Sequence, residues 1–255
     1  MRGKDFVREM EALAAPIAKQ AYDGTCETYA NLSDDQAFRL LGQLWWLEGP
    51  EVPAFARAWW QSIPGDPTGK YRDVEMFLSR QLYDESRHGK LYAAACIQKG
   101  FVKHEQELYG HPYTRPVPGL INFTIWMQHL GNYMFTTLYT AEQLASENLT
   151  FPSFIDAMLR VIDDPIVRGP FEGQYDEERY HGLSGRYVVA KYCHDGALQE
   201  EGLWAAKISW NLLQQMAADL GKFVKDGSVE EMRPAPKYER LALPQPFDKP
   251  SPAAR

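Results

Sequence analysis

The sequence has few cysteines and no surplus of basic residues. Its three cysteines, Cys26, Cys96 and Cys193, lie far apart and form no Cys-x-x-Cys pair. Neither a disulfide framework nor a thiolate zinc site is therefore expected. Asp and Glu number 34 against 27 Lys and Arg, which gives a formal net charge of −7. Because nucleic acids and anionic membranes bind basic surfaces, we expect no nucleic-acid partner and no membrane partner.

Long apolar runs are also missing. No segment approaches the roughly 20 consecutive apolar residues of a membrane-spanning helix. Residues 1–20 place acidic side chains among the apolar ones, which is typical of an amphipathic helix and not of a signal peptide. Together with the scarcity of cysteine, these absences favour a cytoplasmic protein.

Strand signals are weak, and helical patterns take their place. Alternating β-branched runs are few and no Asn-Gly hairpin turn occurs, whereas apolar residues recur at helical spacing over long segments. This periodicity predicts an all-α fold with helices over about 4–22, 34–62, 71–100, 119–148, 153–162, 171–194 and 198–225. Proline-containing turns separate them, among them Asp164-Pro165 and Gly169-Pro170. We expect one domain over residues 1–232 and an extended proline-rich tail over 233–255.

Two of the expected helices repeat one arrangement of polar residues. Glu85 and His88 share a face of helix 71–100, and Glu178 and His181 share the matching face of helix 171–194. Both faces should point to the core, where an unpaired carboxylate costs several kcal/mol. A metal ion would supply the missing positive charge. The spacing Glu-x-x-His puts a carboxylate and an imidazole one turn apart, so both can reach one ion.

Two further glutamates complete the pattern of a dinuclear carboxylate site, in which two helices contribute Glu-x-x-His and two others contribute one Glu each. Glu48 lies 37 residues before Glu85, and Glu142 lies 36 residues before Glu178. Such offsets would place the glutamates of antiparallel neighbouring helices at similar heights. The predicted metal ligands are Glu48, Glu85, His88, Glu142, Glu178 and His181.

Each of the added glutamates has a rival. Glu51 lies one turn beyond Glu48, and Gly49-Pro50 between them favours a kink. We prefer Glu48 because it shares an apolar face and reproduces the offset of the second half. Glu147 rivals Glu142 but lies nearer the expected helix end. A solvent-exposed Glu142 is the alternative to a ligand there.

The run from Tyr83 to Leu91 contains Asp84-Glu85-Ser86-Arg87-His88. It resembles the Asp-Glu-x-Arg-His motif of the ferritin-like di-iron carboxylate oxygenases, especially the hydroxylase subunits of bacterial multicomponent monooxygenases. Ribonucleotide reductase small subunits belong to the same superfamily. The resemblance covers about residues 34–194 and implies a ferritin-like four-helix bundle with additional flanking helices. The second motif, residues 177–181, differs by Glu in place of Asp and Tyr in place of Arg.

The resemblance also implies roles for residues around the ligands. Asp84, and Glu177 at the corresponding place in the second motif, would orient the ligand histidines from outside. Ser146, one turn after Glu142, would take the place of a hydroxyl residue that assists proton delivery. The substrate pocket is expected to be lined by Leu44, Trp45, Tyr92, Phe135 and Leu138.

The function implied by the resemblance is that of a non-haem di-iron oxygenase. Two iron ions, with a manganese–iron pair left open, would activate O2 to hydroxylate, epoxidise or otherwise oxidise a small organic substrate. A reductase or ferredoxin would donate electrons, because the sequence has no flavin or nicotinamide fingerprint. A homodimer is left open. The alternatives are a radical-generating or oxidase protein like a ribonucleotide reductase small subunit, and a non-enzymatic iron-binding or storage protein like ferritin.

Overall fold

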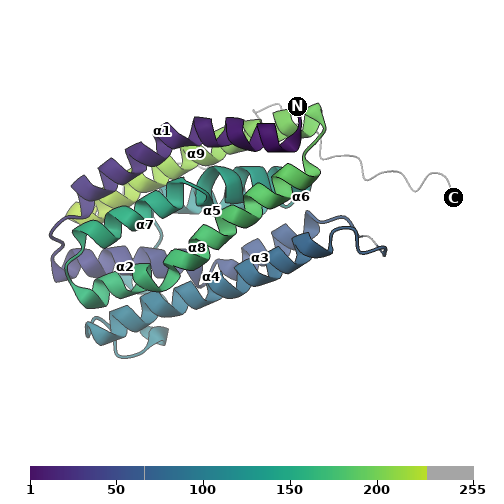
Figure 1. Cartoon of the computed structure of the whole chain (residues 1–255). Helices are drawn as coiled ribbons and strands as arrows, with labels where there is room; N and C mark the ends of the chain where they lie inside the picture. The colour runs from purple at the N-terminus through teal and green to yellow at the C-terminus, as the bar shows by residue number, and fades with distance from the viewer. Residues whose placement is uncertain (66, 229–255) are drawn as a thin grey trace.

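The computed structural model describes residues 1–65 and 67–228, and every regular element in these ranges is helical. The predicted all-α class is therefore confirmed, while the predicted tail over 233–255 lies outside the described residues. The elements are α1 (Gly3–Tyr29), α2 (Asp34–Glu48), α3 (Val52–Gln61), α4 (Arg72–Gln98), η1 (Glu105–Leu108), η2 (Pro112–Thr114), α5 (Pro118–Leu130), α6 (Phe135–Tyr139), η3 (Thr140–Glu147), α7 (Thr150–Val161), α8 (Pro165–Tyr192) and α9 (Gly196–Asp226) (Figure 1). Of these, η3 is a π-helix and η1 and η2 are short 3₁₀ helices.

The long helices lie along two opposite edges of the molecule. Figure 1 shows α1 beside α9 at one edge and α4 beside α8 at the other. The helices α4 and α8 are antiparallel: Lys191 near the end of α8 pairs with Asp73 at the start of α4 at 2.8 Å. At the other end, Lys99 after α4 pairs with Asp164 before α8, also at 2.8 Å. Since α2 packs on α4 and η3 packs on α8, these four segments meet inside the fold.

Side-chain caps fix where two of these segments begin. Ser33 and Gln36 form a reciprocal capping box at the start of α2. The Asp164 carboxylate accepts hydrogen bonds from the amides of Ile166 and Val167 at the start of α8. These caps satisfy amides that have no partner within their own helix, and so they set the register of both segments.

The predicted helix over 34–62 is interrupted. It ends as α2 at Glu48 and resumes as α3 at Val52. The Gly49 amide still donates to the Trp45 carbonyl at 2.9 Å, but Pro50 has no amide hydrogen to continue the ladder. The break places Glu48 at the very end of α2, directed toward α4.

The predicted helix over 119–148 is also divided, into α5, α6 and η3. Gly131 ends α5 where the chain passes very close to α3, because a β-carbon at this position would lie 2.3 Å from the Ala58 carbonyl oxygen. The prediction that Gly169-Pro170 separates helices was wrong, since α8 begins at Pro165 and runs through Pro170. One missing amide near the start of a long helix costs a single hydrogen bond and does not end it.

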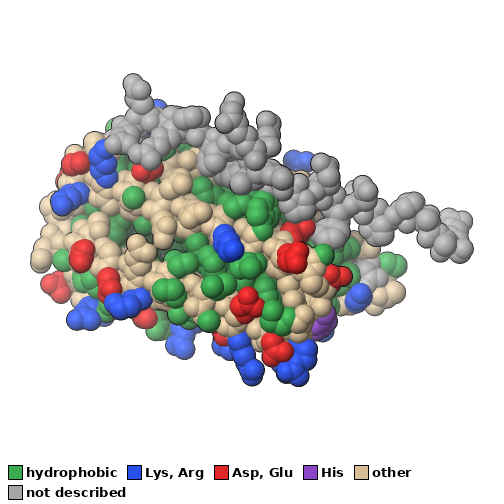
Figure 2. Space-filling model, turned by 90° about the horizontal axis from the view of Figure 1, so that it is seen from above, with side chains coloured by type: hydrophobic (Ala, Val, Ile, Leu, Met, Phe, Trp, Pro, Cys, Tyr) green, Lys and Arg blue, Asp and Glu red, His purple; other side chains and the backbone are tan. Residues whose placement is uncertain are grey.

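Apolar packing surrounds the meeting point of the four segments. All five residues predicted to line a pocket are at most 3% exposed and belong to two packed clusters: Phe135 and Leu138 to one, and Leu44, Trp45 and Tyr92 to the other. Figure 2 views the molecule from the side of α1 and α9, where hydrophobic side chains gather in the middle of the visible surface and charged side chains of both signs lie around them.

None of the helices in the described ranges combines the length and the apolar character required to traverse a bilayer.

Candidate metal centre

The structure brings all six predicted ligands to one place between α2, α4, η3 and α8. Five of them are almost completely buried, with exposed fractions between 0% and 7%: Glu48, His88, Glu142, Glu178 and His181. The Glu85 side chain is 12% exposed. Side chains that are widely spaced along the sequence thus form one acidic cluster, with two imidazoles inside it.

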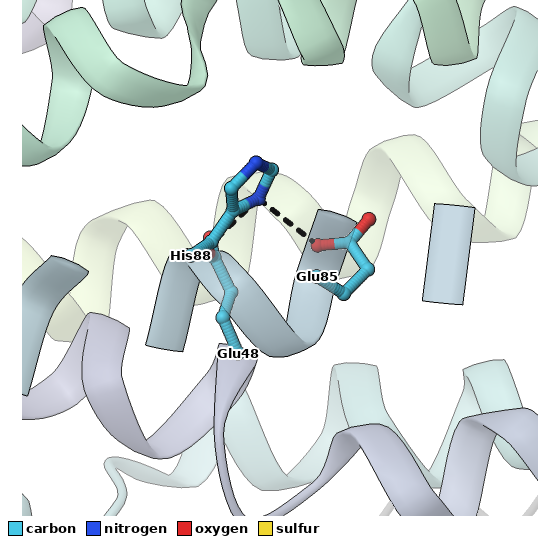
Figure 3. A group of neighbouring side chains, drawn as sticks. All are labelled: Glu48, Glu85 and His88. Carbon is cyan, nitrogen blue, oxygen red and sulfur yellow. Dashed lines mark ion pairs between the residues drawn. The ribbon is translucent and has the colours of Figure 1, made fainter. Parts of the chain in front are cut away.

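Three carboxylates surround the inner nitrogen of His88. Nδ1 of His88 lies 3.2 Å from Glu178 Oε1, 3.4 Å from Glu85 Oε2 and 3.5 Å from Glu48 Oε2. Figure 3 shows Glu48 and Glu85 converging on this nitrogen from α2 and from the preceding turn of α4. Neighbouring ligands of one cation have such spacings when each metal–ligand bond is about 2.1 Å long.

A second group of the same kind surrounds His181. Its Nδ1 lies 3.5 Å from Glu85 Oε1, 3.5 Å from Glu178 Oε2 and 3.6 Å from Glu147 Oε2. Glu85 and Glu178 therefore offer one oxygen to each histidine. The two donor groups are adjacent and share two carboxylates, which is an arrangement suited to two neighbouring cations.

The outer nitrogens of both histidines are held by carboxylates. Nε2 of His88 lies 2.8 Å from Glu177 Oε2, and Nε2 of His181 lies 3.3 Å from Asp84 Oδ2. Each histidine thus takes its outer partner from the other Glu-x-x-His motif. Arg80 donates to Asp84 at 2.7 and 2.9 Å, and Arg87 donates to Glu177. A carboxylate accepts only, so each Nε2 carries its hydrogen and each Nδ1 of a neutral ring keeps its lone pair.

These lone pairs point at carboxylate oxygens. Within the described part of the chain, Nδ1 of His88 and of His181 have no hydrogen-bond partner although both atoms are buried, and the same holds for one oxygen each of Glu48 and Glu142. A nitrogen lone pair facing three carboxylates is repulsive unless a positive charge lies between them. The donor set therefore fits metal cations.

Burial strongly affects the acid groups of the cluster. It raises the pKa of Glu48 and Glu147 well above the ordinary value, and it raises the pKa of Glu142 to about 8. Burial also opposes ionisation of Glu178, but the closeness of its carboxylate to the two histidine rings prevails and lowers its pKa to about 2. The cluster has more negative charge than its low-polarity surroundings stabilise.

The histidines respond in the opposite direction. Burial opposes protonation of His88, yet the nearby carboxylates of Glu178 and Glu85 raise its pKa to about 12. The pKa of His181 is raised for the same reason, with Asp84 and Glu178 as its main partners. Without metal the cluster attracts protons, and metal ions would compete with those protons for the same atoms.

The sequence argument set Glu147 aside, and the structure places it against His181. The reason is the π-helix over Thr140–Glu147, where residues five apart lie on the same side. An α-helix would have placed Glu142 and Glu147 about 140° apart around its axis. In the π-helix both side chains are buried.

Two glycines allow the segments that carry Glu48 and Glu147 to approach. A β-carbon at Gly89, next to His88, would lie 2.6 Å from the Glu48 carbonyl oxygen. A β-carbon at Gly182, next to His181, would lie 2.6 Å from Asn148 Cα and 3.0 Å from the Glu147 carbonyl oxygen. The repeated His-Gly step is thus a sequence signal of close approach, and it pairs Glu147 with Glu48.

Replacing Gly182 with Ala is expected to destabilise the protein by about 1–3 kcal/mol, because backbone atoms must move apart. Urea unfolding would measure the change. Gly24→Ala is the matched control, since Gly24 lies within α1 and has no atom within 4 Å of its added β-carbon. There we expect a gain of up to about 1 kcal/mol from helix propensity. Equal losses in both variants would contradict the role of Gly182.

The remaining predicted site residues have plainer positions. Ser146 is buried in η3, and its hydroxyl donates to the Ala141 carbonyl at 3.1 Å. Glu51 is partly buried at the start of α3, with its pKa raised by burial. Since its rival Glu48 lies against His88, the geometry favours Glu48 in the donor group.

A cavity of about 60 Å³ adjoins the acidic cluster. One side is formed by the glutamates of both donor groups with Glu142 and Ser146 of η3, and the other by apolar residues of α2, α3, α5, α7 and α9. None of the five residues predicted to line a pocket is in its wall; they are part of the packed cores instead. That prediction was wrong because a helical stripe shows which residues are buried but not where packing leaves space.

No protein-family model and no curated protein matches the sequence. The structure is similar to that of a TenA homolog from Pseudomonas syringae pv. tomato, with a TM-score of 0.64 and 12% identity over 85% of this chain and 93% of that one. It is also similar to a domain of unknown function with a heme oxygenase-like fold from Shewanella denitrificans, with a TM-score of 0.64 and 12% identity over 87% of this chain and 94% of that one.

These likenesses overturn the ferritin-like expectation. TenA homologs and heme oxygenase-like folds belong to a different superfamily from the ferritin-like di-iron carboxylate oxygenases. The assignment to that superfamily was wrong, and so were the di-iron oxygenase function drawn from it and its two alternatives, the reductase-like radical or oxidase protein and the storage protein. A five-residue motif specifies about one turn of helix, whereas a fold depends on the order and packing of all helices. The chain has a TenA/heme oxygenase-like all-α fold.

Proposed function

We propose that this protein is a metal-dependent enzyme that holds two first-row transition-metal ions, iron or manganese, and acts on a small organic substrate. One ion would be bound by His88 with Glu48, and the other by His181 with Glu147. Glu85 and Glu178 would bridge the two. The observation that carries the proposal is the pair of buried Nδ1 atoms that face carboxylate oxygens while each Nε2 is held from outside.

The chemistry of the donor set supports iron or manganese. Carboxylates with one imidazole per ion suit these metals, whereas soft metals prefer the sulfur ligands that neither donor group contains. When bound, such ions would supply Lewis acidity. Asp84 and Glu177 would fix the orientation of the imidazoles, with Arg80 and Arg87 balancing their charge.

The adjoining cavity supports a catalytic centre over a purely structural one. Structural metal sites are closed by protein ligands, while catalytic sites keep a side open to substrate. Here the glutamates of both donor groups form part of a cavity wall. Glu142 contributes to neither group of atoms around the Nδ1 nitrogens, and among the five glutamates it is the one we assign to holding a proton beside the substrate.

Metal content after anaerobic loading with Fe(II) or Mn(II) tests the proposal. We expect about two ions per chain in the wild type, and about one or fewer in His88→Ala and in His181→Ala, because each variant removes the only nitrogen ligand of one ion. His194→Ala changes an exposed histidine and should bind as the wild type does. A folded wild type that takes up neither metal would refute the proposed function.

A further inference from the structure

The metal ligands alone do not explain the cavity beside the acidic cluster. We propose that it binds an uncharged, mainly hydrocarbon molecule, held against the carboxylate side of the metal pair and away from the histidines. The inference rests on the proposed function, which it extends from a metal centre to a class of substrate.

The direction of approach follows from the cavity wall. Five glutamates line it, but neither His88 nor His181 does. The imidazoles are closed off from the opposite side by Glu177 and Asp84 and by the arginines that bind these carboxylates. A molecule in the cavity therefore reaches the metal positions only past the glutamates.

Apart from Ser146, the remaining wall is apolar and comes from five helices. It includes Phe55 and Trp59 of α3, Met127 of α5, Phe151 of α7 and Leu213 of α9. No Lys or Arg is among the residues that line this cavity in the described part of the chain. A buried carboxylate or phosphate on a ligand would thus find no cationic side chain there, at a cost of several kcal/mol.

The net charge of the metal centre gives an anionic ligand no advantage either. Two divalent ions supply four positive charges, which the ionised glutamates Glu48, Glu85, Glu147 and Glu178 balance when Glu142 holds its proton and both imidazoles are neutral. The centre then has no net positive charge to offset the cost of burying an anion, whereas an uncharged molecule has no such cost. The volume of about 60 Å³ restricts a rigid ligand to a few heavy atoms, and the flexible side chains of Met127 and Met216 allow somewhat more.

Two ligands of equal size and different charge test this inference. Butyramide and butyrate would be added to the Mn(II)-loaded full chain, and the paramagnetic relaxation of their methyl protons would report binding near the metals. We expect butyramide to bind at least about 10-fold more tightly than butyrate, because only butyrate must bury an unpaired charge. Equal affinities, tighter binding of butyrate, or binding of neither would overturn the inference.

Lysine substitutions in the cavity wall test whether the absence of a cationic side chain causes the preference for the uncharged ligand. Leu213→Lys places a cation in the wall and should reduce the preference for butyramide to less than about 3-fold; Met216→Lys serves the same purpose if the first variant folds poorly. Leu183→Lys is the control, because Leu183 lies on the outer face of α8 with 56% of its surface exposed, and it should preserve the wild-type preference. An unchanged preference in a folded Leu213→Lys or Met216→Lys protein would contradict the charge argument.

Filling the space tests where the ligand binds. Met127→Trp should remove relaxation of both ligands while the chain still binds two Mn(II) ions, since Met127 contacts the cavity and is not a metal ligand. Retained butyramide relaxation in this variant would overturn the assignment to this cavity. A folded wild type that does not bind Mn(II) would instead refute the proposed function, so the two failures are distinguishable.

Discussion

Replacing Glu178 with Gln is expected to empty both metal positions, whereas Glu48→Gln or Glu147→Gln should empty only one. Glu178 offers Oε1 toward His88 and Oε2 toward His181, while Glu48 faces only His88 and Glu147 only His181. The amide removes one bridging oxygen and the negative charge that both ions share. We expect the affinity for each ion to fall by more than about 100-fold in Glu178→Gln.

Mn(II) titration followed by electron paramagnetic resonance would count the bound ions in each variant. Glu172→Gln is the matched control, because Glu172 is exposed on the same helix and pairs with Arg168. It should bind two ions with wild-type affinity. If Glu178→Gln loses no more metal than Glu48→Gln does, the bridging arrangement is incorrect.

The metal-free and metal-loaded chains are expected to respond to pH in opposite directions. In the metal-free chain the pKa of Glu142 rises from 4.5 to about 8, so above pH 4.5 the unfolded chain releases a proton that the folded chain keeps. Stability then falls as pH rises, by on the order of 4 kcal/mol up to pH 8 for this group alone. The raised pKa of His88 adds stability that is complete below pH 6.5 and declines above it.

At the acid end the sign is reversed. The pKa of Glu178 is lowered to about 2, so its contribution is present above pH 4.5 and is lost as pH falls toward 2. The metal-free chain should therefore be most stable near about pH 5. Metal ions need the ionised carboxylates, so the loaded chain should gain stability from pH 5 toward pH 8.

Urea unfolding at several pH values, with EDTA or with saturating Mn(II), would measure this divergence. Glu142→Gln removes the carboxyl group whose pKa is raised to about 8, and it should make the pH dependence of the EDTA-treated chain shallower, with Glu48, Glu147 and His88 still contributing. Parallel curves for the two forms of the wild type would mean that the cluster does not exchange protons for metal.

The sequence was sufficient for the elements whose apolar period is uninterrupted. The predicted helix 71–100 is observed as α4 over Arg72–Gln98, and the predicted 198–225 as α9 over Gly196–Asp226. Prediction failed where a local interruption decided the outcome. At Gly49-Pro50 the apolar period continues but the hydrogen-bond ladder does not.

The sequence also predicted one part of the site correctly and failed for another. Within one motif the distance between Glu85 and His88 is set by a single helical turn, and the in-phase spacing was enough to bring them together. The choice between Glu142 and Glu147 depended on the pitch of their helix, and the α-helical period assumed for the sequence does not apply to a π-helix. The order in which helices pack is not encoded by either motif, which is why the inferred superfamily was wrong.

Each histidine of the metal centre is held by a carboxylate from the other Glu-x-x-His helix, so the centre requires both helices. His88 depends on Glu177 for its orientation, and His181 depends on Asp84. A fragment that contains only α4 would have an imidazole free to rotate and a carboxylate without its partner, and a fragment with only α8 would have the reverse. Neither helix by itself could form one complete metal site. We therefore expect the two ions to bind only after α4 and α8 have packed against each other.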